Sequence, residues 1–84
     1  MATAMARVVF PDHLLKHTQG TSELEVSAES YRAVVRALNE RWPGIEDVLA
    51  KTAVAIDGQI YQDAWLEPVE PKSEVFFLHR IEGG

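Results

Sequence analysis

The most regular pattern in this chain is Tyr31-Arg32-Ala33-Val34-Val35-Arg36-Ala37-Leu38-Asn39-Glu40-Arg41-Trp42. Large apolar side chains recur in it at offsets of three, four, seven and eleven residues from the first, namely Tyr31, Val34, Val35, Leu38 and Trp42. This spacing places them on one face of an α-helix, and Arg32, Arg36, Asn39 and Glu40 fall on the opposite face. The pattern predicts an amphipathic helix that must bury its apolar stripe against another element.

The residues around this helix predict where it begins and ends. Ser27 is a candidate N-cap, and Glu29 is expected in the first turn, where a negative charge favours the helix dipole. Pro43-Gly44 is expected to end the helix, since proline cannot continue the ladder and glycine accepts a left-handed cap. The pattern from Ile45 to Lys51 is too short to distinguish one further helical turn from a loop.

Two strands are predicted before the helix. Arg7-Val8-Val9-Phe10-Pro11 is rich in β-branched and aromatic residues and closes with a proline. Glu23 to Ser27 alternates polar and apolar residues, which is typical of a half-buried strand with Leu24 and Val26 facing a core. The turn residues 18–22 lie between them. We therefore predict that these strands form a hairpin.

Three further strands are predicted after the helix. Residues 53–56 and 59–61 flank Asp57-Gly58, a pair that tolerates the positive φ of a type I′ hairpin turn. A turn-rich connection over residues 68–73 precedes the last strand, Glu74 to Ile81. Strand alternation places Val75, Phe77 and His79 on one face and Phe76, Leu78 and Arg80 on the other. Because both faces are apolar, we expect this strand to be central in its sheet.

These elements predict an α+β domain in which a mixed sheet packs on one main helix, the ubiquitin-like β-grasp arrangement. The predicted core consists of Val8, Phe10, Leu24, Val26, Val35, Leu38, Val54, Ile56, Val75 and Phe77. We expect a flexible N-terminus over residues 1–6, the β-grasp domain over residues 7–81 and a flexible tail over residues 82–84. Trp42 and Trp65 are expected to pack.

Composition narrows the classes of function. Eighty-four residues are enough for one small domain. The net charge is −5 and no cluster of Lys and Arg is visible, which argues against binding nucleic acid. No apolar run approaches the roughly 20 residues that span a bilayer, and the first residues do not resemble a signal peptide. Because cysteine is absent, a reducing compartment fits, and we expect the protein in the cytoplasm.

At this point the chain resembles the MoaD/ThiS family of sulfur-carrier proteins, which includes the small subunit of molybdopterin synthase. Val54-Ala55-Ile56-Asp57-Gly58 is similar to the family's Val-x-Val-Asn-Gly hairpin, and Leu66, residues 74–78 and Ile81-Glu82-Gly83-Gly84 are similar to its later segments. The chain has Pro71-Lys72-Ser73 where the family usually carries Asp-Gly-Asp, and His79-Arg80 where it usually carries Pro-Pro.

The resemblance implies a carrier and not an enzyme. Carboxylates at a chain terminus have a pKa of about 3.3–3.7, so at neutral pH they are anions and poor electrophiles. In the family, an adenylating enzyme joins the terminal glycine to AMP, and a sulfur donor displaces AMP to leave a thiocarboxylate. Gly84 takes that role here, and Gly83 lets the tail enter the enzyme's channel. The chain itself binds no cofactor, since the partner holds ATP and magnesium.

The implied partners are that ubiquitin-activating-like enzyme and a sulfur-acceptor enzyme or synthase large subunit. We expect Ile60, Phe76 and Leu78 on the outer sheet face, with Arg80 and Ile81, to contact them. The pathway stays open between molybdopterin, thiamine, cysteine and tRNA thiolation. Two alternatives remain as well: a ubiquitin-like modifier that joins Gly84 to lysines, or a non-catalytic ubiquitin-like binding module.

Other candidate sites carry less weight. Asp12, His13 and His17 could form a metal site, because two histidines four residues apart share a helix face, but exposed loop residues are the better interpretation. His79 could act as an acid or base, although a strand histidine without a catalytic role is the better interpretation. The chain has neither a Gly-x-Ser-x-Gly nucleophile setting nor a glycine-rich phosphate loop, which disfavours an autonomous enzyme.

Overall fold

The computed structural model describes residues 5–62 and 64–78. In chain order its elements are β1 (Ala6–Val9), the short 3-10 helix η1 (Asp12–Leu14), β2 (Glu23–Val26), α1 (Tyr31–Arg41), α2 (Ile45–Leu49), β3 (Ala53–Ile56), β4 (Gln59–Tyr61) and β5 (Glu74–Leu78). The predicted flexible tail, with Gly83 and Gly84, lies outside the described residues. So do His79, Arg80 and Ile81.

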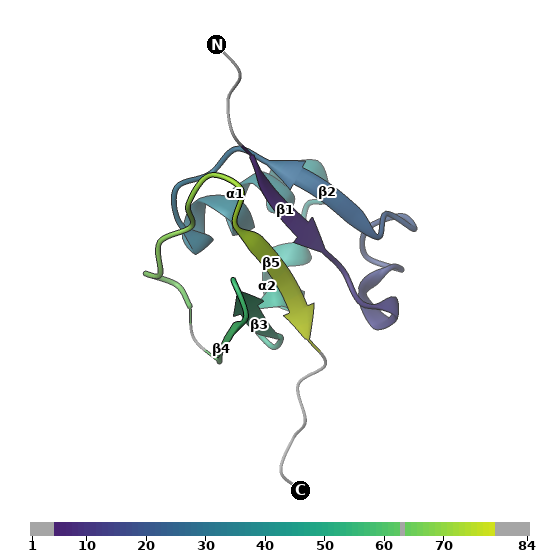
Figure 1. Cartoon of the computed structure of the whole chain (residues 1–84). Coiled ribbons are helices and arrows are strands. Elements are labelled where there is room, and N and C mark those ends of the chain that lie inside the picture. The colour runs from purple at the N-terminus through teal and green to yellow at the C-terminus, as the bar shows by residue number, and fades with distance from the viewer. Residues whose placement is uncertain (1–4, 63, 79–84) are drawn as a thin grey trace, which may run out of the picture.

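Within the described residues, five strands form one mixed sheet in the order β2-β1-β5-β3-β4. β5 lies in the middle, parallel to β1 and antiparallel to β3, while β1–β2 and β3–β4 are antiparallel hairpins. Figure 1 shows the sheet from the face opposite the helices, so that α1 and α2 lie behind it. The predicted central position of the last strand and the predicted β-grasp architecture are confirmed.

The alternation in β5 follows from its place at the centre of the sheet. Val75 and Phe77 are buried beneath the helices, whereas Phe76 and Leu78 point to the outer face. The register joins Val75 to Ile56 on one side and to Val8 on the other, so that the buried positions of three neighbouring strands lie in one row. A strand with partners on both edges has no solvent-exposed backbone edge, and its inner face can be wholly apolar.

The helix α1 begins later than predicted. Its N-cap is Ser30, whose side-chain oxygen accepts a hydrogen bond from the backbone N–H of Ala33 at 3.1 Å. Ser27 therefore does not cap it, and Glu29 lies before the helix and not in its first turn. The cause is a long-range pairing, because the Glu29 carbonyl accepts from the Val69 N–H at 3.1 Å and keeps this segment extended. The sequence around Ser27 contains no sign of that partner.

The other end of α1 is as predicted. The Trp42 N–H donates to the Leu38 carbonyl, and Gly44 takes a left-handed φ of 97°. A second helix, α2, starts directly after it, and the Asn39 side-chain oxygen accepts from the backbone N–H groups of Gly44 and Glu46 at 3.0 and 3.2 Å. The segment that the sequence left undecided is thus a helical turn tied to α1 by one amide side chain.

Aromatic side chains pack both ends of α1 against the sheet. Phe10, directly after β1, packs against Trp42 with ring centroids 5.7 Å apart and stacks on Phe77 of β5 at 5.6 Å. Tyr31, at the start of α1, contacts the same Phe77 ring at 6.2 Å. Both ends of the helix therefore contact one aromatic cluster. Leu24 is only partly buried, in contrast to the prediction, because β2 is an edge strand.

The turn before β5 contains a residue in a strained conformation. Residues 70–73 form a turn in which the Ser73 N–H donates to the Glu70 carbonyl at 3.0 Å. Pro71 occupies its second position, as predicted, and Lys72 adopts a positive φ of 69° at the third. This is the position of a type II turn at which glycine is favoured.

We expect Lys72→Gly to raise the free energy of unfolding by about 0.5–1 kcal/mol, since removing the left-handed strain outweighs the added freedom of glycine in the unfolded chain. Urea denaturation of the two proteins measures the difference. Lys72→Ala is the control, because it removes the same charge and keeps the strain. A gain in the alanine variant equal to that in the glycine variant would assign the effect to charge and contradict the conformational explanation.

Candidate functional site

The outer face of the sheet carries a continuous apolar row. Strand register places Ile60 of β4 opposite Ala55 of β3, Ala55 opposite Phe76 of β5, and Phe76 opposite Val9 of β1. Ile60 is 67% exposed and Phe76 is 37% exposed, while Ala55 and Val9 are half-buried. Leu78 is half-buried as well. We call Ile60, Ala55, Phe76, Val9 and Leu78 the apolar row.

Charged side chains border the apolar row on the β1–β2 side. The guanidinium of Arg7 donates to the Glu23 carboxylate and, at 3.2 Å, to the Glu74 carboxylate. The hydrogen bond from Arg7 lowers the pKa of Glu23, and the same bond raises the pKa of Arg7. All three side chains are solvent-exposed. The apolar row therefore meets a polar border at this side of the sheet, a composition that protein-contact surfaces share.

Asp57 fixes the hairpin that presents Ile60. Its backbone N–H donates to the Glu74 carbonyl at 2.9 Å, and its carboxylate accepts from the Glu74 N–H at 2.9 Å and from the Ser73 hydroxyl at 2.7 Å. Asp57 and Gly58 have positive φ values of 51° and 85°, as the predicted turn requires. Three hydrogen bonds thus join the β3–β4 turn to the start of β5, which keeps Ile60 and Phe76 on one surface.

The strand β5 leads from the apolar row toward the expected reactive end. Because β5 is parallel to β1, its last described residue, Leu78, lies at the end of the sheet where β1 also ends. Leu78 pairs with Ala53 at the start of β3. Residues 79–84 follow directly, and the predicted site residues Arg80, Ile81, Gly83 and Gly84 among them lie outside the described residues.

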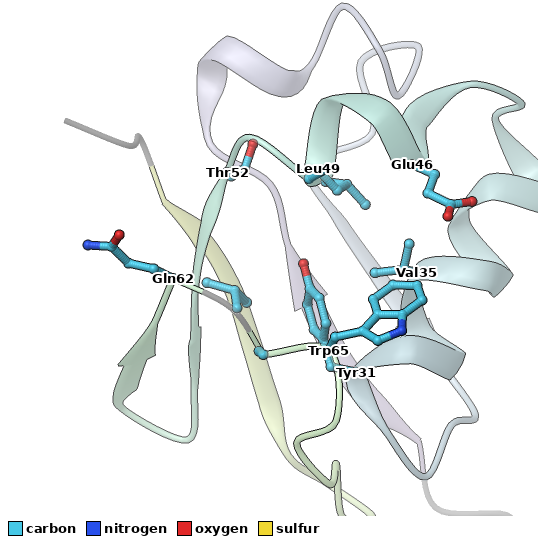
Figure 2. Close-up of a pocket in the computed structure, with 10 residues that line it drawn as sticks. Tyr31, Val35, Glu46, Leu49, Thr52, Gln62 and Trp65 are labelled. Carbon is cyan, nitrogen blue, oxygen red and sulfur yellow. The ribbon is translucent and has the colours of Figure 1, made fainter. Parts of the chain in front are cut away.

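A pocket of about 390 Å³ opens on the helix side of the molecule. Its walls come from α1, from α2, from the start of β3 and from the loop after β4, and the lining residues are Tyr31, Val35, Glu46, Leu49, Ala50, Thr52, Val54, Gln62, Ala64 and Trp65. Figure 2 shows Glu46 and Leu49 on α2 facing the same space as Tyr31, Val35 and Trp65. Burial raises the pKa of the Tyr31 phenol above its ordinary value.

Solved structures of other proteins are similar to this chain. No known protein-family profile matches the chain, and no curated protein matches it. The crystal structure of the Amycolatopsis orientalis BexX/CysO complex contains a similar chain, CysO. It superimposes with a TM-score of 0.82 and 19% sequence identity, and the match covers 94% of this chain and 99% of the other. This chain has the ubiquitin-like β-grasp fold. The solution structure of small archaeal modifier protein 1 from Methanosarcina acetivorans superimposes with a TM-score of 0.79, 19% identity and complete coverage of both chains. The resemblance to MoaD/ThiS proteins thus extends to the fold.

Several predictions about individual residues can now be judged in this β-grasp domain. Trp42 is buried as predicted, but the prediction that Trp65 packs is wrong in part, because Trp65 is 36% exposed at the pocket. A backbone hydrogen bond joins the loop that carries Trp65 to the start of α1, where the Tyr31 N–H donates to the Glu67 carbonyl. Asp12 and His13 are exposed on η1, whereas His17, in the turn that follows, is half-buried, so the prediction of three exposed loop residues is correct only in part. Within the described part of the chain, no three His, Asp or Glu side chains are grouped so that they could hold a metal ion.

Sequence reasoning missed two parts of these surfaces. Val9 and Ala55 belong to the apolar row. Strand parity, together with the order in which the strands pair, could have predicted that they lie on this face. The pocket could not be found in this way, because its four walls come from elements far apart in the sequence. Among residues 5–62 and 64–78, no helix is long and apolar enough to cross a membrane.

Proposed function

We propose that this protein is a sulfur carrier, and that Gly84 is its reactive residue. A partner enzyme joins the Gly84 carboxylate to AMP, and a sulfur donor converts the product to a thiocarboxylate. A sulfur-acceptor enzyme, such as the large subunit of a molybdopterin-type synthase, then receives the sulfur. The chain acts as substrate and carrier, and the partner holds ATP and magnesium. We assign this cycle to the cytoplasm, where ATP is available.

The chemistry explains why the activation step is needed. A carboxylate oxygen of Gly84 attacks the α-phosphorus of ATP, and pyrophosphate leaves. The acyl adenylate is an electrophile, so a sulfide-level sulfur donor attacks the carbonyl carbon and AMP leaves with the electron pair of the broken bond. A glycine at position 83 has no side chain to obstruct a narrow channel, and such a channel holds the carboxylate in line with the phosphorus.

One observation carries the proposal: the chain has the fold of CysO and of small archaeal modifier protein 1, and its sequence carries Gly83-Gly84 after residues 79–82, which follow its central strand. The CysO structure is a complex with BexX, so a protein of this fold does bind a partner chain. The apolar row supports the proposal further. An exposed apolar surface on the strand that the tail follows in sequence suits docking, because a partner bound there contacts the last described residues before that tail.

The deciding measurement is the mass of the protein purified from its own cells. Replacement of one oxygen by one sulfur on the peptide that contains Gly84 is the expected result. The same spectra test the second candidate, a protein modifier, which the likeness to small archaeal modifier protein 1 favours. A Gly-Gly remnant linked to lysines of other proteins, without any sulfur on the carrier, would replace the carrier function with the modifier function.

Docking through the apolar row gives a separate prediction. We expect Ile60→Ser to weaken binding to the activating enzyme or the sulfur acceptor by about tenfold, since truncating an apolar anchor residue of an interface costs about 1–2 kcal/mol. Phe76→Ser should act in the same direction. Surface plasmon resonance with the partner measures both.

Leu66→Ser is the matched control, because Leu66 is also exposed, at 84%, but lies in the loop between β4 and β5. Its affinity should stay within twofold of wild type. Circular dichroism verifies that each variant is folded. Equal affinities of wild type and Ile60→Ser, with both proteins folded, would remove this face from the docking surface.

A further inference from the structure

The lining of the helix-side pocket is apolar at its floor and carries a negative charge at its mouth. Tyr31, Val35, Leu49 and Val54 are buried and supply an apolar floor. Of the lining residues in the described chain, Glu46 alone carries a charge, and it is solvent-exposed at the mouth. A ligand that matches this arrangement has an apolar end that lies innermost and a positive charge that stays at the surface.

The pocket is preformed because backbone hydrogen bonds hold the segment that carries Trp65. The Tyr31 N–H donates to the Glu67 carbonyl at 2.9 Å, and the Glu67 N–H donates to the Ala64 carbonyl at 2.9 Å. The guanidinium of Arg32 lies over the Trp65 ring, 5.9 Å from its centroid. These contacts keep the indole at the mouth, where it cannot collapse onto the floor. Sites for small ligands are usually formed before the ligand arrives.

We propose that this pocket binds an aromatic amine, with its ring on the apolar floor and its ammonium group beside the Glu46 carboxylate. The volume of about 390 Å³ is within the range of small-ligand sites. The rings of Tyr31 and Trp65 line the site and favour packing of a further aromatic ring, while the Arg32 guanidinium already lies over the Trp65 ring. The hydroxyl of Tyr31 adds one hydrogen-bonding group to the lining.

This site is independent of the sulfur-carrier function. The pocket is lined by α1 and α2, which lie behind the sheet in Figure 1, by the inner side of β3 and by the loop after β4, whereas the apolar row lies on the opposite face of the sheet. A partner bound to the apolar row therefore leaves the pocket accessible. The amine would act as an additional ligand of the carrier, and its binding can be measured whether or not Gly84 ever accepts sulfur.

The test uses three probes of similar shape and different charge on the full chain: phenethylamine, 2-phenylethanol and 3-phenylpropionate. Nitrogen-15 NMR titrations give the affinities and identify the amides that shift. We expect shifts around Leu49, Ala50 and Trp65, and about two- to fivefold tighter binding of the amine than of the alcohol, as for an exposed ion pair. The carboxylate should bind most weakly. Equal affinities of amine and alcohol, no binding of any probe at 10 mM (about 2.7 kcal/mol of standard binding free energy), or shifts confined to the apolar row would overturn the proposal.

Two variants make the test specific. Glu46→Gln should remove the preference for the amine and leave the alcohol's affinity unchanged. Asp47→Asn is its matched control, since it removes an equal charge from the neighbouring residue of α2, outside the pocket lining. Ala50→Phe should block all probes, because Ala50 lies at the mouth in an ordinary helical conformation that accepts a larger side chain. Loss of the preference in Asp47→Asn as well, or unimpaired binding to Ala50→Phe, would contradict the assigned site.

Discussion

Removal of Gly84 is expected to abolish sulfur loading and to leave the free energy of unfolding unchanged. Loading requires the carboxylate to reach the α-phosphorus of ATP, and a chain shorter by one residue withdraws it by about 3.3–3.6 Å. A displacement of that size is far larger than the tolerance of an in-line attack. The stability should not change, since the described core ends with β5 at Leu78. One extra alanine after Gly84 should have the same effect.

The experiment incubates each protein with its activating enzyme, ATP, magnesium and a sulfur source, and then measures intact mass. Gly83→Leu is included because its side chain would meet the walls of the channel and lower loading as well. Deletion of residues 2–4, at the other end of the chain, is the matched control and should load normally. If the chain without Gly84 still supplies sulfur as well as the full chain, the carrier function is wrong and a binding module replaces it.

Periodic patterns predicted the five strands and the main helix correctly because they report on burial along a single segment, whereas η1 was not predicted and α2 was left undecided. The stripe from Tyr31 to Trp42 predicted α1, and the doubly apolar pattern of residues 75–78 predicted a central strand. Each of these signals repeats several times within its own segment, so one irregular residue does not hide it. The type of each element and the face that it buries were therefore accessible from the sequence.

Contacts between distant segments explain the errors. Ser27 matches the residue type of an N-cap, but the Val69 N–H binds the Glu29 carbonyl and delays the helix to Tyr31. The same pairing holds the loop that keeps Trp65 exposed, although a tryptophan in so small a domain is expected to pack. A residue pattern cannot reveal a partner forty residues away, and both errors have this one cause.

The candidate sites also differ in how far the sequence alone could predict them. Ile60, Phe76 and Leu78 could be assigned to one outer face by strand parity alone, and the register adds Val9 and Ala55 to it. The pocket depends on the packing of α1, α2, β3 and a loop, for which no motif exists. The residues of the tail were proposed from family resemblance, and their roles remain predictions that the loading experiment tests.

The second large effect is expected in the core. Leu38 lies in the middle of α1, is 0% exposed and belongs to the cluster between helix and sheet. Leu38→Ala should lower the free energy of unfolding by about 2–5 kcal/mol, because it removes buried methyl groups and leaves a cavity that the packed neighbours fill only in part. Natural domains have a free energy of unfolding of only about 5–15 kcal/mol in total, so the variant is expected to lose a large fraction of its stability.

Leu66→Ala is the matched control for this prediction, since it makes the same chemical change at a leucine that is 84% exposed. Its free energy of unfolding should change by less than about 0.5 kcal/mol, as for other surface substitutions. Chemical denaturation of both variants, with unchanged m-values, isolates the contribution of burial from that of leucine itself. A loss at Leu38 no greater than the loss at Leu66 would show that α1 does not pack on the sheet through this residue. Because the apolar row lies on the opposite face, a Leu38→Ala protein that is still folded should bind its partner with wild-type affinity.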